Sequence, residues 1–349
     1  MFVGKVLVAV MVALVSMSVQ KESACVLILC KNTHLESLRD TIAAFEERFN
    51  KRFQYPYVLL NDAEFDENFK TGFQTMTQAE VSFGLVPKEH WSFPAWVDPG
   101  KARERMDAMA REGVLYGGME SYRHMCRFFS GFFYKHPLVQ KYRYYWRVEP
   151  DTLLHCTIDY DVFEYMSTNR KKYGFVISLH EYPGTIKSLW KTVQNFVSTT
   201  NTNFKQGQAW SIFAKENLKR FVTDEMFTHY NMCHFWSNFE IGDFSFFRSP
   251  LYESFFGFLD RSGGFFYERW GDAPVHSIAA SLFLDRSEIH FFEDIGYTHP
   301  PFTHCPKLSL QKTPCSCDAA KSVDLLMPAC TNLYRAIDLF EKPPQAQAS

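Results

Sequence analysis

Residues 24–30 read ACVLILC, and this stretch decides the fold. A short continuous apolar run is typical of a strand that is buried on both faces of a parallel sheet. The following residues 33–50, THLESLRDTIAAFEERFN, repeat apolar side chains at helical spacing, and residues 55–62, YPYVLLND, return to a strand pattern. Strand, amphipathic helix and strand in succession predict a βαβ unit with a right-handed crossover, and therefore a parallel sheet.

The helix in this unit has its own sequence signals. Thr33 and Glu36 have the spacing of a capping box, which predicts the helix start. The apolar positions expected on its buried face are Leu35, Leu38, Ile42, Phe45 and Phe49.

The same alternation continues along the chain. Residues 82–100, SFGLVPKEHWSFPAWVDPG, interrupt it and are interpreted as a long aromatic loop, which in a compact domain is usually functional or a lid. Helices are predicted from residue 119 to before Pro137 and at 159–170, 185–200, 250–260 and 275–284, with Gly263 and Gly264 ending the fourth of these. Strands are predicted at 142–151, 171–179 and 289–295. The predicted class is α/β, with a mixed, mainly parallel sheet flanked by helices.

The composition is that of a protein with a large core and no polyanion-binding surface. The chain has 349 residues, of which 46% are hydrophobic and 17% aromatic, and a formal net charge of -2. We therefore expect one large domain and no nucleic-acid partner. Aromatic rings with polar tips suit the stacking of sugars or nucleobases, although a phenylalanine-rich core accounts for most of them.

The N-terminal residues 1–20, MFVGKVLVAVMVALVSMSVQ, place one lysine before an apolar run from Val6 to Val19. This is a secretory signal, and the run is shorter than the about 20 residues usual for a membrane span. A cleaved signal peptide and a short signal-anchor that contacts the membrane both remain open. The predicted organisation is this segment, a single catalytic domain at 24–335 and a C-terminal tail at 336–349.

Secretion implies an oxidising compartment in which cysteines pair. The chain has nine cysteines, so at least one stays unpaired. Four of them, Cys305, Cys315, Cys317 and Cys330, crowd a late segment that we expect to be irregular chain stapled onto the domain. A zinc site is the alternative, but the spacing is not that of a zinc finger.

Residues 144–151, YYWRVEPD, end a predicted strand in two carboxylates. Ligands of open α/β sheets bind beyond the carboxyl ends of the strands. If the backbone stays extended, Glu149 and Asp151 project to the same side, and hard oxygen ligands of this kind suit Mg²⁺ or Mn²⁺ bound to a diphosphate. The alternative is a capped strand end that makes only turn hydrogen bonds.

Three further polar positions stand among aromatic residues. Glu240 lies within an aromatic stretch, where a carboxylate is either satisfied by a partner or tuned for catalysis. Asp272 precedes a helix start at Pro274 and could serve only as its N-cap. His299, before a Pro-Pro break, is a candidate metal ligand or an ordinary surface histidine. The motifs of serine hydrolases, zincins, P-loop NTPases and dinucleotide-binding proteins are missing from the sequence.

Five segments taken together carry a family resemblance. They are YRHMCRFFSGFFYKHP, YYWRVEPD, YNMCHFWSNFEIGDFSFFRS, GGFFYERWGDAPVHSIA and HFFEDIGYTHPP, in this order. The chain from Ala24 to Cys330 closely resembles the fungal α-1,2-mannosyltransferases of glycosyltransferase family 15, which extend protein-linked mannose in the Golgi. The resemblance implies a GT-A-like nucleotide-sugar transferase fold, a type II membrane protein of the Golgi or endoplasmic reticulum lumen, a GDP-mannose donor, a Mn²⁺ cofactor and a mannosylated glycoprotein acceptor.

The resemblance also implies roles for the site residues. Glu149 and Asp151 match the family's acidic motif at the metal and diphosphate, and His299 matches its metal-binding histidine. Tyr122 falls on a tyrosine at the donor phosphates.

On the sugar side, Glu240 matches the carboxylate proposed as nucleophile, and Asp272 an aspartate near the acceptor. The resemblance implies a transfer that retains the anomeric configuration. Glu240 would either form a covalent mannosyl-enzyme or stabilise an oxocarbenium-like ion, and the sequence does not choose between these roles.

Several alternatives remain open at this level. A mannosylphosphate transferase, a catalytically silent mannose-binding protein and a metal-dependent hydrolase would all keep the fold. The acceptor could carry O-linked chains, N-linked chains or both. The chain departs from its relatives in that the first predicted strand follows the apolar run almost at once, without the usual longer anchor and stem.

Overall fold

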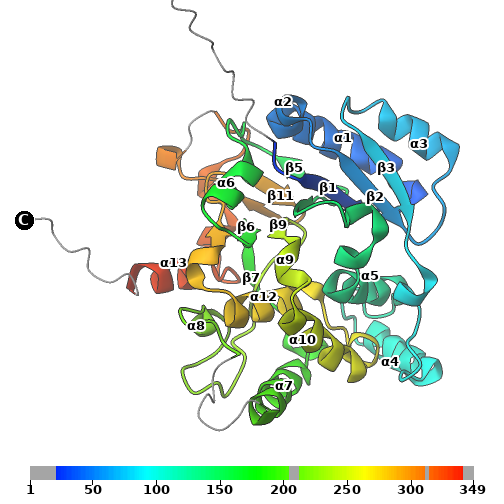
Figure 1. The fold of residues 1–349 in the computed structure, drawn as a ribbon, viewed down its shortest axis with the longest axis vertical. Coiled ribbons are helices and arrows are strands. Elements are labelled where there is room, and N and C mark those ends of the chain that lie inside the picture. The colour runs from blue at the N-terminus through cyan, green and yellow to red at the C-terminus, as the bar shows by residue number, and fades with distance from the viewer. Residues whose placement is uncertain (1–20, 204–211, 311–313, 341–349) are drawn as a thin grey trace, which may run out of the picture.

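The computed structural model describes residues 21–203, 212–310 and 314–340, and its centre is a seven-stranded sheet in the order β10-β6-β9-β4-β1-β2-β3 (Figure 1). The strands are β1 Ala24–Leu29, β2 Tyr57–Asn61, β3 Val81–Leu85, β4 Tyr144–Arg147, β5 Leu153–Leu154, β6 Tyr173–Phe175, β7 Ser178–His180, β8 Cys233–Phe235, β9 Glu240–Asp243, β10 Ile289–Phe291, β11 Tyr297–His299 and β12 Phe302–His304. The α-helices are α1 Leu35–Phe45, α2 Lys51–Phe53, α3 Glu67–Gln74, α4 Pro99–Arg111, α5 Glu120–Gly131, α6 Val162–Thr168, α7 Leu189–Asn203, α8 Lys219–Val222, α9 Phe244–Phe247, α10 Pro250–Arg261, α11 Gly264–Tyr267, α12 Asp272–Phe283 and α13 Thr331–Phe340. Two small sheets, β12-β11-β5 and β7-β8, accompany the large one.

The predicted βαβ unit is confirmed. β1 pairs in parallel with β2 on one side and with β4 on the other, so it lies inside the sheet. Five of its six residues are buried, as the continuous apolar run indicated. In the seven-stranded sheet, β9 alone runs antiparallel to both of its neighbours, β4 and β6. The fold is therefore the predicted mixed, mainly parallel α/β architecture.

Helices cover both faces of this sheet. Because side chains alternate along each strand, one strand contributes to the cores on both faces. On β4, Tyr145 belongs to a core that includes residues of α5, α10 and α12. Tyr144 and Trp146 belong to the opposite core, with residues of α1, α3 and α6. Arg147 lies on the same side as Tyr145, with its guanidinium 3.5 Å from the ring centre of Phe129 on α5. The strand thus aims a charged side chain into the α5 and α12 layer, close to its carboxyl end.

Some local boundaries differ from the prediction. Thr33 and Glu36 form no capping box, because a 3₁₀ turn at Asn32–His34 precedes α1 and His34 occupies its N-cap. The predicted aromatic loop begins with the edge strand β3 and ends in α4, so irregular chain is confined to the part between them. The helix expected to end at Gly263 and Gly264 is α10, which ends at Arg261; Gly263 is the N-cap of the short helix α11 and Gly264 is its first residue.

The late cysteine-rich segment is stapled to the domain, as predicted. Disulfides join Cys156 to Cys315, Cys233 to Cys330 and Cys305 to Cys317. The three remaining cysteines, Cys25, Cys30 and Cys126, are free and buried. The predicted domain end at residue 335 falls within α13, which continues to Phe340.

Among the described residues, no helix is both long enough and apolar enough to cross a membrane. The predicted signal or anchor at residues 1–20 lies outside the described residues.

Candidate functional site

The acidic motif after β4 forms a turn. Asp151 has a φ of 64°, in the left-handed region, so the expectation of an extended backbone through both acids is wrong. The hydroxyl of Thr152 donates to the backbone carbonyl of Glu149 over 2.7 Å, which is a hydrogen bond of the capped strand end. The turn exposes the Asp151 side chain while the Glu149 side chain stays three-quarters buried. The two acids therefore differ in their surroundings, with Asp151 exposed and Glu149 mostly buried.

Glu149 faces His299 instead. Oε2 of Glu149 lies 3.7 Å from Nε2 of His299, and the two side chains are 24% and 25% exposed. Two ligands of one small divalent ion, each about 2.1 Å from it, can lie this far apart. Carboxylate and imidazole are both donors for divalent transition metals, and the partial exposure leaves room for phosphate or water ligands. These two residues fit a Mn²⁺ site.

Asp151 does not join them at this distance. In the described part of the chain, His180, Cys233 and Cys330 are the one group whose three ligand atoms all lie within 4.8 Å of one another. Two of these are the sulfurs of a disulfide, so this group is not a metal site in the oxidised protein. A role for Asp151 at the ion stays a prediction.

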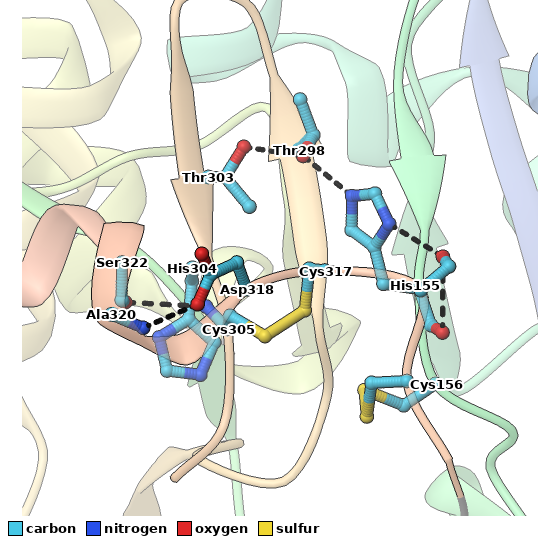
Figure 2. The surroundings of a disulfide bond; sticks show 12 residues. His155, Cys156, Thr298, Thr303, His304, Cys305, Cys317, Asp318, Ala320 and Ser322 are labelled. Atoms are coloured by element: carbon cyan, nitrogen blue, oxygen red, sulfur yellow. Dashed lines mark hydrogen bonds between the residues drawn. A yellow bond between two sulfur atoms is a disulfide. The ribbon is translucent and has the colours of Figure 1, made fainter.

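The hairpin that carries His299 is braced from two sides (Figure 2). The hydroxyls of Thr298 on β11 and Thr303 on β12 lie 2.6 Å apart, and Nε2 of His155 lies 2.6 Å from the Thr298 hydroxyl. Just after β12, Cys305 is joined to Cys317. His299 therefore stands at the end of a strand that is held by β12, by His155 and by the disulfide that follows β12.

Asp272 is the first residue of α12, and the N-cap is Gly271, so the alternative in which Asp272 serves only as the N-cap is wrong. Its Oδ2 accepts from Nη1 of Arg147 over 2.5 Å and from the hydroxyl of Ser237 over 2.7 Å. Burial acts to raise the pKa of Asp272, but the charge of Arg147 outweighs it and holds the pKa below its ordinary value. Asp272 is therefore a buried, ionised carboxylate.

Arg147 is the residue of this site that sequence reasoning missed. Its Nη2 donates to Oε1 of Glu149, and its side chain is only 2% exposed. Burial acts to lower the pKa of Arg147, but the carboxylates of Glu149 and Asp272 raise it above its ordinary value. The sequence offered only its position, two residues before Glu149 in a strand of aromatic residues, and no sign of its partner Asp272.

Glu240 lies deeper, on β9, at 0% exposure. It accepts a hydrogen bond from the hydroxyl of Tyr145 at Oε1 and one of 2.6 Å from the hydroxyl of Tyr173 at Oε2. Oε2 also lies 2.8 Å from Nδ1 of His276. The β4 and β9 ladder places it directly opposite Arg147. Both oxygens of the Glu240 carboxylate therefore have hydrogen-bond partners. This is one of the two interpretations that the sequence left open.

Tyr122 lies on α5 and is held by another arginine, Arg269. Its hydroxyl accepts from Nη1 of Arg269 over 3.0 Å, and its ring stacks on Tyr116 with 4.7 Å between ring centres. Nη2 of Arg269 in turn lies 3.5 Å from Oε1 of Glu181. Burial raises the pKa of Tyr122 well above its ordinary value, so the hydroxyl stays protonated and can donate to a phosphate or sugar oxygen.

The structure therefore brings together Glu149, His299 and Asp272 through Arg147, with Glu240 beneath them. A cavity of about 630 Å³ lies elsewhere, between α6 and the edge strand β10, and none of the predicted site residues lines it. The carboxyl end of β4 is the candidate site.

Comparison with known proteins shows which family the chain resembles. The family model described as "Glycolipid 2-alpha-mannosyltransferase" matches residues 6–339. The chain is 48% identical over 325 residues to "Alpha-1,2 mannosyltransferase KTR1" of Saccharomyces cerevisiae, with 93% of this chain and 80% of the relative covered. It is 48% identical over 324 residues to "Glycolipid 2-alpha-mannosyltransferase 1" of Candida albicans, with 92% and 73% covered.

Solved structures agree. Core-mannan synthase A from Aspergillus fumigatus, in its Mn/GDP form, is 40% identical and superposes with a TM-score of 0.81 over 87% of this chain and 80% of that chain. The mannosyltransferase Ktr4p from Saccharomyces cerevisiae, in complex with GDP, is 39% identical with a TM-score of 0.85 over 92% and 83%.

Proposed function

The chain belongs to the glycolipid 2-alpha-mannosyltransferase family, glycosyltransferase family 15, and from this premise we propose that it transfers mannose from GDP-mannose to a mannose acceptor with Mn²⁺ as cofactor. The fold is of the GT-A kind, and the chain is a GDP-mannose-dependent glycosyltransferase. The proposed product is an α-1,2-linked mannoside, with the anomeric configuration of the donor retained.

One observation supports the assignment most strongly. The carboxylate of Glu149 and the imidazole of His299 meet at 3.7 Å beyond the carboxyl end of a central strand. This is where α/β sheets bind their ligands, and the pair suits a divalent ion that carries a diphosphate. When bound there, Mn²⁺ would supply positive charge to the leaving diphosphate.

The chain's own residues divide the remaining tasks. Tyr122, fixed by Arg269, orients the donor phosphates with its hydroxyl. Asp272, ionised and held by Arg147 and Ser237, accepts a hydrogen bond from the acceptor mannose and so orients its hydroxyl.

Glu240 is proposed as the carboxylate that favours positive charge at the sugar ring. Its three hydrogen-bond partners and its complete burial support an electrostatic role in stabilising an oxocarbenium-like ion. A covalent role is less well supported, because a carboxylate that already accepts three hydrogen bonds is a poor nucleophile and has no exposed oxygen.

The biological setting follows from the resemblance alone. We propose a luminal Golgi enzyme, held at the membrane by its N-terminal segment, that extends O-linked or N-linked mannose chains on glycoproteins, including those destined for the cell wall. Expression with a fluorescent tag, followed by co-localisation with Golgi and endoplasmic reticulum markers, tests this setting.

The activity is tested with the purified chain, GDP-mannose, Mn²⁺ and methyl-α-mannoside. NMR of the product is expected to show an α-1,2-linked disaccharide, and no product should form without Mn²⁺. A charged, acid-labile product would identify a mannosylphosphate transferase, and free mannose released without acceptor would identify a hydrolase. Mannose binding without Mn²⁺-dependent GDP affinity would identify a silent binding protein.

A further inference from the structure

Arg147 makes two hydrogen bonds that connect the two halves of the site. Nη2 donates to Oε1 of Glu149, and Nη1 donates to Oδ2 of Asp272 over 2.5 Å. The guanidinium carbon lies over the ring of Phe129, 3.5 Å from its centre, and the side chain is 2% exposed. The position of this group is therefore fixed by packing as well as by charge.

The pairing is selective between the two oxygens of Glu149. Arg147 occupies Oε1, and the oxygen that lies 3.7 Å from His299 is Oε2. The terminal torsion of a glutamate is broad, so an unheld carboxylate would turn readily and present its oxygens in many orientations. Holding one oxygen leaves the other aimed at the place where the metal ion is proposed to bind.

Stability alone does not account for a charge at this position. A buried ion pair costs desolvation and is often no more stable than packed apolar side chains of similar size. Arg147 also leaves its Nε without a hydrogen-bond partner among the described residues. Its hydrogen bonds to carboxylates go to Glu149 and Asp272. These two carboxylates lie on the GDP-mannose side and on the acceptor side of the proposed reaction.

We propose that Arg147 is a positioning residue that holds Oε1 of Glu149 so that Oε2 is presented to the metal ion, and that fixes Asp272 at a set distance from it. The inference rests on the proposed function, because it takes the ion to bind between Glu149 and His299. It assigns to Arg147 the part that outer-shell partners of metal ligands have, where loss of the partner weakens metal affinity by about 10-fold to 100-fold.

The test uses Arg147→Lys, which keeps the charge but cannot hold two carboxylates with one fork. The matched control is Arg127→Lys, since Arg127 makes an equally buried two-bond pair with Asp260, at 2.7 and 2.9 Å, outside the site. Electron paramagnetic resonance of free Mn²⁺, with the full chain and saturating GDP, measures the affinity. We expect affinity to fall about 10-fold or more in Arg147→Lys and less than about 2-fold in the control.

A double-mutant cycle separates positioning from a general loss of structure. If Arg147 acts through Glu149, Arg147→Lys should weaken Mn²⁺ binding little further when Glu149→Gln is already present. Additive losses would overturn the inference, as would a folded Arg147→Lys variant with wild-type Mn²⁺ affinity. Equal losses in the Arg127→Lys control would also overturn it.

A milder variant covers the case in which Arg147→Lys does not fold. Phe129→Leu keeps the arginine but removes the ring against which it lies, and should lower Mn²⁺ affinity by about 3-fold or more. Unchanged affinity in this variant would count against the proposal.

Failure of the proposed function would look different. A wild-type chain that binds Mn²⁺ with GDP but makes no mannoside contradicts the proposed function. The comparison of Mn²⁺ affinities between the variants then still supports or rejects the role of Arg147. A wild-type chain that binds no Mn²⁺ overturns both.

Discussion

Nδ1 of His276 lies 2.8 Å from Oε2 of Glu240, and neither side chain is exposed to solvent. The other ring nitrogen, Nε2, lies 2.9 Å from the backbone carbonyl of Phe129. A carbonyl and an ionised carboxylate can only accept, so an imidazolium with both nitrogens protonated satisfies the two contacts. Burial acts to lower the pKa of His276, but Glu240 outweighs it and raises the pKa above its ordinary value. These contacts favour an imidazolium that is paired with the carboxylate of Glu240, a charged pair beneath the site.

This pair predicts a pH-dependent stability. Because the pKa of His276 is raised in the folded state, its stabilising contribution is complete below the ordinary value of 6.5 and is lost as the pH rises through the folded-state pKa. The thermal unfolding midpoint of His276→Gln should therefore lie further below that of the wild type at about pH 6 than at about pH 8. A gap that does not change with pH would contradict the charged pair.

Glu240→Gln should keep GDP binding but lose mannose transfer by about 10³-fold or more, because it removes the charge opposite the developing positive charge of the sugar. Transfer is measured with GDP-mannose and methyl-α-mannoside, and GDP affinity by calorimetry. Thermal unfolding of the variant controls for the hydrogen bonds that the amide disturbs. A rate near that of the wild type would remove Glu240 from the chemistry.

His299→Ala should weaken Mn²⁺-dependent GDP binding by about 10-fold or more, because one of the two proposed protein ligands is lost. His229→Ala is a suitable control, since His229 is a histidine with a 71% exposed side chain. The Mn²⁺ titration is followed at fixed GDP. If the titration curve of His299→Ala overlays that of the wild type, His299 is not a ligand.

Gly242→Ala should lower activity through Tyr145. A Cβ at residue 242 would lie 2.6 Å from a ring carbon of Tyr145 and 2.8 Å from its hydroxyl oxygen, so the ring must move and its hydrogen bond to Glu240 is disturbed. We expect a several-fold loss of transfer with little change in Mn²⁺ affinity, since Glu149 and His299 are untouched. Equal losses of both would indicate a general disturbance of the fold.

The disulfides should separate stability from metal binding. The Cys233–Cys330 bond spans 97 residues and the Cys305–Cys317 bond 12, so the loop-entropy model assigns a larger stabilisation to the first, about 4.7 against about 3 kcal/mol for loops of roughly these lengths. Removing the first pair by double serine substitution should lower the unfolding free energy more. Removing the second should lower Mn²⁺ affinity more, because that bond follows the hairpin that carries His299. Measured effects in the opposite order would contradict the bracing described for this hairpin.

The sequence predicted those parts of the fold that depend on local pattern. The buried strand Ala24–Leu29, the helix after it and their parallel crossover follow from apolar periodicity, which holds whatever the rest of the chain does. The edge strand Val81–Leu85 was missed, because its half-exposed residues run into Pro87 and an aromatic stretch that resembles a loop. The capping box at Thr33 was predicted wrongly, because the chain enters α1 through a 3₁₀ turn and His34 is the N-cap. The N-cap alternative for Asp272 fails for a similar reason, because the chain enters α12 at Gly271.

The site was predicted in part for the same reason. Glu149 and His299 carry recognisable local context, and their meeting was expected from the family resemblance. Arg147 and His276 act through partners far away in the chain, 125 residues for Arg147 and Asp272 and 36 for His276 and Glu240. No local pattern reports such pairs, because they exist only once the sheet has brought β4, β9 and α12 together.

The three unpaired cysteines can report whether the chain is folded. Cys25 and Cys126 are fully buried and Cys30 nearly so, and burial raises the pKa of each thiol far above its ordinary value. In the folded enzyme all three are shielded from alkylating reagents, whereas the six disulfide-bonded sulfurs cannot react without a reductant. Mass spectrometry after a timed pulse of such a reagent would therefore count opened molecules directly, and would distinguish loosening at β1 from loosening at α5 without any engineered label.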